Sequence, residues 1–228
     1  MKQGKFQLYG RRRAKPLRPR QQELIARLLP NLRIDIEGRA IDPAALFDNL
    51  KRDVWLEIGF GGGEHLANLA ARHSDIGFVG AEPFVNGIAK LLLAIDEQRL
   101  ANIRIFDDDA RPLLQSFTGS SLGRIFILYP DPWPKRRHEK RRLLSPLIVA
   151  DLHRVMRPGA ELRLASDSAD YMAWGLRNIL SHGGFEWLAC SARDWRSPPS
   201  GWTQTRYEAK ALREGRKPVY LRFTRKNA

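Results

Sequence analysis

Short apolar runs alternate with amphipathic stretches from residue 53 onward, and this alternation restricts the possible folds more than any other feature of the chain. Five apolar runs each predict a strand, and the amphipathic stretch after each run predicts a helix. The predicted strands are 54–58, 76–81, 103–106, 125–129 and 161–165. The predicted helices are 64–72, 85–100, 110–117, 143–156 and 171–181. Strands joined in this way run parallel, with helices on both faces. Two late strands, 185–190 and 219–224, lack a full crossover. We therefore expect an α/β fold with a seven-stranded, mostly parallel sheet and one antiparallel strand near the C-terminus.

The net charge of +14 is concentrated in two segments. Residues 1–20 hold eight Lys or Arg and no acid, and residues 135–142 hold six Lys or Arg and one acid. The rest of the chain is almost neutral, which favours a polyanionic partner over an evenly solvated surface. Pro16 and Pro19 oppose helix formation, so we expect residues 1–20 to be a mobile basic arm on a single domain spanning 21–228. A disordered tail without a role is the alternative for the arm alone.

Cysteine, histidine and hydropathy patterns exclude several classes of protein. Cys190 is the only cysteine, so an intrachain disulfide and a thiolate metal site are ruled out. The five histidines show no ligand spacing, and we expect no metal site. No apolar run approaches the length of a membrane span and no apolar leader begins the chain, so we expect a cytoplasmic protein without a membrane contact. We also expect no obligatory protein partner.

A glycine loop, Gly59-Phe60-Gly61-Gly62-Gly63, separates the first predicted strand from its helix. Glycines permit positive φ and let a ligand approach the backbone at a helix N-terminus. The dinucleotide-binding fingerprint requires a glycine at the position of Glu64, which speaks against a nicotinamide cofactor. A tight turn without a ligand is the alternative interpretation of this loop.

Acidic residues stand at the ends of three successive predicted strands: Glu57, Glu82 and Asp109. The C-terminal ends of parallel strands meet at one edge of the sheet, where ligands bind. Glu57 suits the ammonium or ribose of S-adenosylmethionine, Glu82 suits both ribose hydroxyls, and Asp109 suits the adenine amino group. Any one of them alone could be a helix cap. Together with Gly59 and Gly61 they predict an S-adenosylmethionine site.

A rigid acidic loop, Tyr129-Pro130-Asp131-Pro132-Trp133-Pro134, follows the fourth predicted strand and leads into the cationic segment. The two prolines restrict the backbone of Asp131. A fixed carboxylate, an aromatic face and cations at one strand end predict chemistry on a nucleic acid base, with Asp131 as the catalytic group facing the cofactor. We expect Lys135 to lie nearest the base or its phosphate, and five cations to bind the RNA backbone: Arg136, Arg137, Lys140, Arg141 and Arg142. A purely structural turn is the alternative.

Two further segments carry acids that could accept the N–H donors of a guanine edge. Asp167 follows the fifth predicted strand, and Glu208 ends the stretch Thr205-Arg206-Tyr207-Glu208. Asp167 could instead cap the next helix, and Thr205 with Glu208 could be an ordinary capping box. The sequence leaves open which acid reads the base. Trp133 and Tyr207 are candidates for stacking on it.

With these residues assembled, the chain resembles the bacterial tRNA (guanine-N7-)-methyltransferase family from about Leu8 to its C-terminus. The most specific element is Pro130-Asp131-Pro132-Trp133 with the cations after it, and residues 56–61 and 205–208 support it. The resemblance implies a Rossmann-like class I methyltransferase fold and methylation of guanine N7 at position 46 in the tRNA variable loop. It departs from the family at Ser166, where threonine is usual, and at Gly62-Gly63, where a bulkier residue is common.

The resemblance also implies roles for individual residues. S-adenosylmethionine is expected to contact Glu57, Glu82, Asp109 and Asp131, with Asp131 also catalytic. The substrate site is expected to contain Lys135, Asp167, Thr205, Arg206, Tyr207 and Glu208.

Three alternative functions stay open. The first is an RNA methyltransferase of the same fold that acts on another position, although Pro130 before the acid argues against the amino-methylating class. The second is a nicotinamide-dependent reductase, against which Glu57 and Glu64 speak. The third is a non-catalytic RNA chaperone, which would not need acids at four strand ends.

Overall fold

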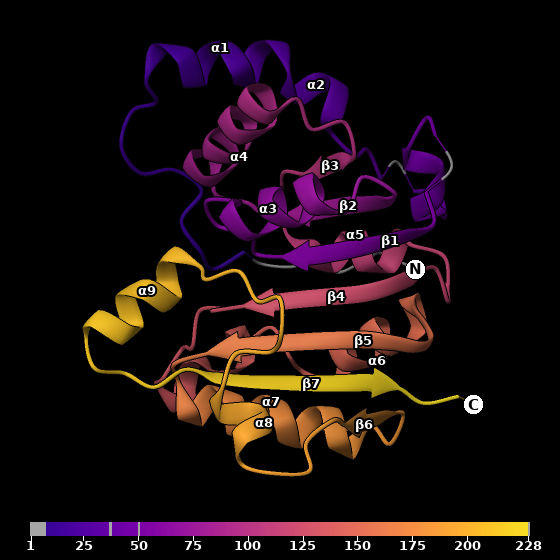
Figure 1. Cartoon of the computed structure of the whole chain (residues 1–228), viewed down its shortest axis with the longest axis vertical. Helices are drawn as coiled ribbons and strands as arrows, with labels where there is room; N and C mark the ends of the chain where they lie inside the picture. Colours follow the sequence, from indigo (N-terminus) through magenta and orange to yellow (C-terminus); the bar gives the residue numbers. More distant parts are fainter. Residues whose placement is uncertain (1–7, 37, 50, 228) are drawn as a thin grey trace.

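The computed structural model describes residues 8–36, 38–49 and 51–227, which form a central sheet covered by helices (Figure 1). The strands are β1 (Asp53–Ile58), β2 (Ile76–Ala81), β3 (Ile103–Phe106), β4 (Leu122–Leu128), β5 (Met156–Ser166), β6 (Phe185–Trp187) and β7 (Val219–Arg225). The helices are α1 (Pro19–Arg27), α2 (Leu29–Leu32), α3 (Glu64–Arg72), α4 (Val85–Gln98), α5 (Ala110–Ser116), α6 (Pro146–Val155), α7 (Ala169–Ser181), α8 (Arg193–Arg196) and α9 (Arg206–Arg213), with 3₁₀ turns η1 (Pro43–Leu46) and η2 (Arg136–Arg141). In this part of the chain, no helix is both long and apolar enough to span a membrane.

The sheet has the order β3-β2-β1-β4-β5-β7-β6. Strands β1 to β5 pair in parallel, and β7 runs antiparallel to both β5 and β6. The predicted seven-stranded sheet with one antiparallel strand is therefore confirmed. The order reverses between β1 and β4, and in such sheets a crevice opens beyond the C-terminal ends of the two strands at the reversal.

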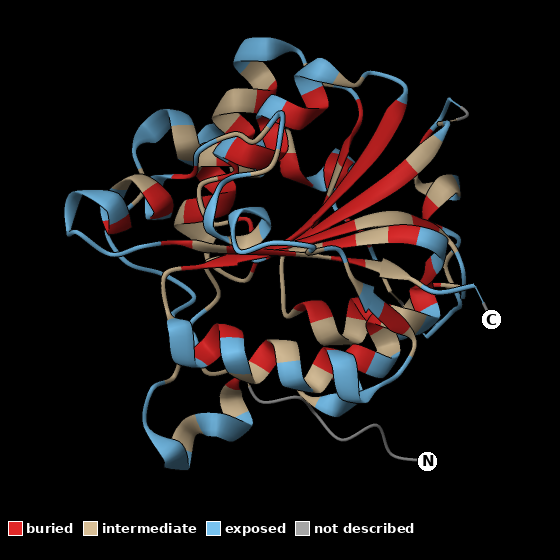
Figure 2. Ribbon diagram, turned by 60° about the horizontal axis from the view of Figure 1, so that its bottom comes forward, coloured by how far each residue is buried: buried red, intermediate tan, exposed pale blue. Residues whose placement is uncertain are grey.

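Hydrophobic cores lie on both faces of the sheet, and β1 contributes to each because alternate side chains of a strand point to opposite sides. Leu56 and Ile58 pack with residues of α5, α6 and α7, whereas Trp55 packs with residues of α1, α3 and α4. Figure 2 shows buried residues along the strands and on the inward sides of the helices on both faces. The same alternation places Glu57 on the face of α3.

Several element boundaries differ from the sequence prediction, and three of the differences have a clear physical reason. Pro19 begins α1 instead of opposing it, because a proline at the first helical position loses no hydrogen bond. Helix α6 begins at Pro146, three residues later than predicted, after Ser145 as its N-cap. Strand β5 begins at Met156 and includes the predicted end of the preceding helix, because Met156 pairs with Leu122 of β4.

The described part of the basic arm lies against the N-terminal end of α4. The carbonyl oxygen of Arg12 accepts a hydrogen bond from Val85 N at 2.9 Å. The Asn86 side chain bonds the backbone of Ala14 and Lys15 at 2.9 and 2.8 Å. Residues 1–7 of the arm lie outside the described residues, and its mobility stays a prediction.

Candidate active site

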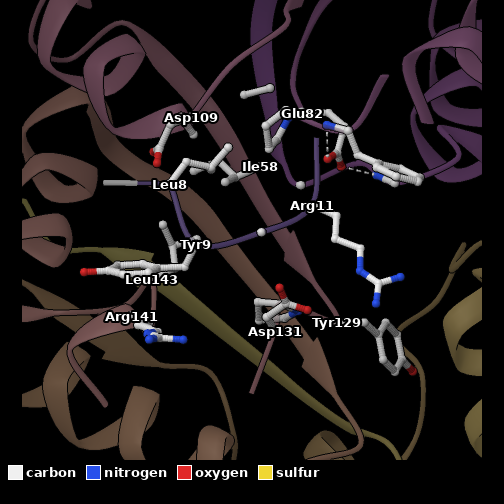
Figure 3. Close-up of a pocket in the computed structure, with 18 of the residues that line it drawn as sticks. Leu8, Tyr9, Arg11, Ile58, Glu82, Asp109, Tyr129, Asp131, Arg141 and Leu143 are labelled. Carbon is white, nitrogen blue, oxygen red and sulfur yellow. Dashed lines mark hydrogen bonds between the residues drawn. The ribbon is translucent and has the colours of Figure 1, made fainter. Parts of the chain in front are cut away.

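A cavity of about 640 Å³ opens at the C-terminal ends of β1 and β4, where the strand order reverses (Figure 3). Ligand sites typically occupy about 300–1,000 Å³, so this volume suits a small molecule. The lining comes from the glycine loop, the ends of β2 and β3, the loop after β4 and the N-terminal arm. Seven predicted site residues are among the lining: Gly59, Gly61, Glu82, Asp109, Asp131, Arg141 and Tyr207.

The glycine loop follows a path that only glycine adopts without strain. Gly59, Gly61 and Gly63 have φ angles of 75°, 56° and 77°, which confirms the positive φ predicted for this loop. Gly87 in the first turn of α4 lies so close that a Cβ built on it would stand 2.0 Å from the carbonyl oxygen of Gly61. The close packing of α4 against the Gly61 carbonyl therefore fixes the position of the glycine loop.

Glu82 is buried just after β2 and ties that strand to the glycine loop. Its carboxylate accepts hydrogen bonds from Gly61 N at 2.7 Å and from Phe84 N at 3.0 Å. Burial raises the pKa of Glu82 to about 7, against the effect of the two N–H donors, and the negative charges of Asp131 and Glu57 add to the rise. In Figure 3, Glu82 and Asp109 lie on one side of the cavity and Asp131 on the other.

Asp109 lines the cavity and also caps α5. Its side chain accepts a hydrogen bond from Arg111 N at 2.9 Å and forms a salt bridge with the Arg111 guanidinium at 2.5 Å. Both carboxylate oxygens already accept from Arg111, so a ligand would share this carboxylate with the cap, and contact with a cofactor stays a prediction.

Glu57 lies behind the glycine loop and outside the cavity lining. The residue is 2% exposed, and Glu57 Oε2 lies 2.7 Å from His65 Nδ1 in the first turn of α3. The His65 ring packs against Phe126 and Trp202, with centroids 4.9 and 5.7 Å apart. The pair thus joins β1 to α3 beneath the loop, and contact between Glu57 and a cofactor stays a prediction.

Asp131 stands in a loop with a positive φ on either side of it. Tyr129 has φ 51° and Trp133 has φ 41°, and such conformations cost non-glycine residues about 1–3 kcal/mol each. The Asp131 side chain is exposed to the open cavity, yet the surrounding loop removes enough water to raise the pKa of its carboxyl. No donor in the described ranges forms a hydrogen bond to this carboxylate. It is therefore available to a substrate.

Arg142 holds that loop from behind. The residue is 5% exposed, and its guanidinium donates to the carbonyls of Pro132 at 3.1 Å and Trp133 at 3.4 Å. It also forms a salt bridge with Asp170 at the start of α7 and lies 5.4 Å from the ring centroid of Trp174. The prediction that Arg142 binds the RNA backbone is thus corrected, because its donors are buried against the loop that carries Asp131.

Arg141 lines the cavity, where its guanidinium lies between two aromatic rings. It stands 4.6 Å from the ring centroid of Tyr9 and 4.9 Å from that of Trp133. The predicted contact of Arg141 with an RNA backbone stays a prediction, and the structure adds that this residue forms part of the cavity wall. The other four predicted backbone-binding cations are exposed, in or beside η2: Lys135, Arg136, Arg137 and Lys140.

Thr205 and Glu208 belong to a buried hydrogen-bond network that anchors α9. Thr205 Oγ1 accepts from Glu208 N at 3.1 Å, as the capping interpretation expects. The Glu208 carboxylate accepts from Trp202 Nε1 at 2.6 Å and from the Tyr220 hydroxyl at 2.5 Å. Glu208 is therefore not placed to read a guanine edge. Tyr207, its neighbour, is 58% exposed and lines the cavity.

Asp167 and Arg206 lie outside the cavity lining and have charged partners. Asp167 forms a salt bridge with Arg216 at 2.9 Å. Arg206 lies 3.6 Å from Glu64 and lines a second hollow beyond Tyr207. Within the described ranges, no group of three or more His, Cys, Asp or Glu is arranged to hold a metal ion.

The N-terminal arm contributes a wall of the cavity that sequence reasoning missed. Residues 8–11 are part of the lining and cross the opening in Figure 3. The Tyr9 ring meets the Trp133 ring edge-on at 6.3 Å, so the arm contacts the loop that carries Asp131. The available signal was the uncharged stretch Leu8-Tyr9-Gly10 inside an otherwise basic segment.

Comparison with known proteins identifies relatives along nearly the whole chain. Residues 51–221 match a family model described as "Putative methyltransferase". The chain is 51% identical to the tRNA (guanine-N(7)-)-methyltransferase of Agrobacterium fabrum, over 96% of this chain and 94% of that protein. It is 46% identical to the protein of the same name from Rhodospirillum rubrum, over 96% of this chain and 87% of that protein.

Solved structures with a similar fold include enzymes of different reactions. The 16S rRNA methyltransferase KamB aligns with a TM-score of 0.57 at 17% identity, over 81% of this chain and 91% of its own. The [4+2]-cyclase SpnF aligns with a TM-score of 0.52 at 13% identity, over 82% of this chain and 79% of its own. At these identities the likeness shows the fold alone, and the reaction has to be argued from the site.

Proposed function

The chain belongs to the tRNA (guanine-N(7)-)-methyltransferase family, and we propose that it methylates N7 of a guanine in tRNA with S-adenosylmethionine as methyl donor. The observation that carries the proposal is the 51% identity to a relative of that name over 96% of the chain. The target we propose is the variable-loop guanosine at position 46. Because the substrate is tRNA, we further propose that the enzyme is cytoplasmic.

The cavity suits S-adenosylmethionine. A Cβ built on Gly59 meets nothing within 4 Å, so there is open space where a ligand can lie against the backbone. The Glu82 oxygens keep lone pairs beyond those used by Gly61 N and Phe84 N, and they can accept the two ribose hydroxyls. Asp109 faces the same space and can accept the adenine amino group. When bound, the cofactor supplies an electrophilic methyl group on a sulfonium.

Asp131 is the residue we propose to act on the reacting base. Guanine N7 attacks in line with an in-plane lone pair and carries no proton, so the reaction needs no general base. Positive charge develops on the purine as the methyl group arrives. A carboxylate fixed across the cavity from Glu82 stabilises that charge and orients the ring.

Contacts with tRNA come from the exposed residues around the opening. Lys135, Arg136, Arg137 and Lys140 are solvent-exposed cations that can neutralise phosphates. Tyr207 is the better candidate for stacking on the base, because its ring is exposed whereas the Trp133 ring packs against Tyr9 and His138. Glu208 and Thr205 contribute by anchoring α9, which carries Tyr207.

The test is transfer of labelled methyl groups from S-adenosylmethionine to tRNA, followed by nuclease digestion and identification of the labelled nucleoside. We expect 7-methylguanosine, and no transfer to a transcript in which the variable-loop guanosine is replaced by adenosine. Label in another nucleoside would favour the same-fold methyltransferase of different specificity. Absence of any transfer, with binding of a nicotinamide cofactor, would favour the reductase.

A further inference from the structure

A second hollow adjoins the cavity on the far side of Tyr207. Its volume is about 610 Å³, and it lies between α9, the glycine loop and the first half of α4. Gly61, Phe84 and Tyr207 line both spaces. Tyr207 therefore stands at the boundary between them, and a nucleotide whose base entered the cavity beside Tyr207 would have its chain neighbours close to the hollow.

Cations dominate the lining of the hollow. Lys90 comes from α4, and Arg206, Lys210 and Arg213 come from α9, against the single acid Glu64. Glu64 lies near Arg206. Within the described ranges Lys90 and Arg213 form no ion pair, so their charges are available to a ligand.

The exposed face of α9 differs from that of an ordinary solvated helix. Tyr207 is 58% exposed and Leu212 is 48% exposed, and both lie among the cations of the hollow. Alternating aromatic or apolar contact surface and positive charge is typical of sites that track a single nucleic acid strand. Figure 1 shows α9 projecting beyond the ends of β1, β4 and β5, on the side where the cavity opens.

The hollow is also preformed. Glu208 is 3% exposed and bonds Trp202 and Tyr220, which fixes α9 to β7. The opposite wall is equally rigid, because Gly87 of α4 packs directly on the carbonyl of Gly61. An RNA strand that binds here would lose little free energy to ordering of the protein, and such preorganisation favours binding.

We propose that the hollow between α9 and α4 is a second site for the tRNA backbone, at which Lys90, Lys210 and Arg213 bind phosphates next to the target guanosine. The inference rests on the proposed function and extends it. The two RNA-binding surfaces, this hollow and the exposed cations of residues 135–140, then meet at the cavity, with the target base between them. Tyr207 separates the target base from its neighbour in the strand.

The test compares two triple variants of the full-length protein with equal loss of charge. One is Lys90→Gln with Lys210→Gln and Arg213→Gln. The matched control removes three exposed cations, one in α7, one in α8 and one just after β7, with Arg177→Gln, Arg193→Gln and Lys226→Gln. For each protein, tRNA affinity is measured over a range of salt concentrations, separately from turnover and from S-adenosylhomocysteine binding.

We expect the hollow variant to bind tRNA about 10- to 100-fold more weakly than the control, with a salt slope smaller by about 2–3 because three phosphate contacts are lost. Its turnover at saturating tRNA and its affinity for S-adenosylhomocysteine should equal those of the wild type. Equal tRNA affinities and slopes in the two variants would overturn the proposal. Failure of the wild type to methylate tRNA would instead overturn the proposed function, while the binding comparison would still decide whether the hollow holds RNA.

Discussion

The two sides of the cavity each present a carboxylate, but they hold it in different ways. Glu82 is buried and bonded directly to two backbone amides, so its position is part of the sheet edge. Asp131 is exposed to the cavity, and its loop is held indirectly, through Arg142 and the carbonyls of Pro132 and Trp133. The side that we propose for the cofactor therefore has its acceptor fixed in place, whereas the other side keeps a charged group available and stores backbone strain in the loop that carries it.

The largest expected effect is that of removing the charge of Asp131. Asp131→Asn keeps the shape of the side chain, so we expect turnover to fall by about 10²–10³-fold while the affinities for tRNA and S-adenosylhomocysteine change little. Single-turnover kinetics with separate binding measurements would check this. If both affinities fell as much as turnover, Asp131 would act in binding, as we propose for Glu82, and the proposed difference between the two carboxylates would be wrong.

A substitution of Arg142 tests whether its hydrogen bonds to Pro132 and Trp133 position the loop that carries Asp131. Arg142→Lys keeps the charge but cannot reach both carbonyls and Asp170 at once, and we expect turnover at saturating tRNA to fall by about 10–100-fold with an unchanged KM for tRNA. Lys140→Gln is the matched control from the exposed part of the same segment, and it should raise KM without lowering turnover. A raised KM and normal turnover in Arg142→Lys would mean that the residue contacts RNA after all.

The smallest expected effect is a pH dependence on the cofactor side. Since burial raises the pKa of Glu82 to about 7, its carboxyl is partly protonated below that pH, and the ligand-free protein should lose stability as pH rises from about 4.5 to 7. Ribose hydroxyls prefer the ionised acceptor, so affinity for S-adenosylhomocysteine should rise by about fivefold from pH 6 to 7 and by about twofold more up to pH 8, and then level off. Calorimetry at several pH values would show this rise, and Glu82→Gln should abolish it. A pH-independent affinity in the wild type would mean that Glu82 is already ionised before the cofactor binds.

Several features of the fold and site were predictable because they depend on neighbouring residues. Strand and helix periodicity located the elements of the sheet, and the positive φ of Gly59 and Gly61 follows from a glycine loop between a strand and a helix. The N-cap hydrogen bond of Thr205 is equally local. Gathering of Glu82, Asp109 and Asp131 at one edge follows from parallel strands ending on the same side.

Other features could not be predicted from local pattern. Lys140 and Arg142 are two residues apart and carry the same charge, yet one is exposed and the other is buried against Asp170, 28 residues later. Glu57 lies on a strand with apolar cores on both faces, so alternation alone does not tell that its side chain contacts His65 of α3 and stays out of the cavity lining. The rings of Tyr9 and Trp133 are in contact, although more than half of the sequence separates the two residues, and no local pattern predicts such a contact.

The amino-acid sequence by itself predicted the class of fold correctly and led to the proposals for the ligand and for Asp131, because strand periodicity, glycine stereochemistry and side-chain charge act over a few residues. Only the tertiary structure decided which like-charged residues face solvent, that Glu57 stands behind the glycine loop, and that the N-terminal arm forms a wall of the cavity. Those outcomes depend on contacts between segments far apart in the chain, and burial at such contacts determines whether a charge is available to a ligand or engaged in holding the fold.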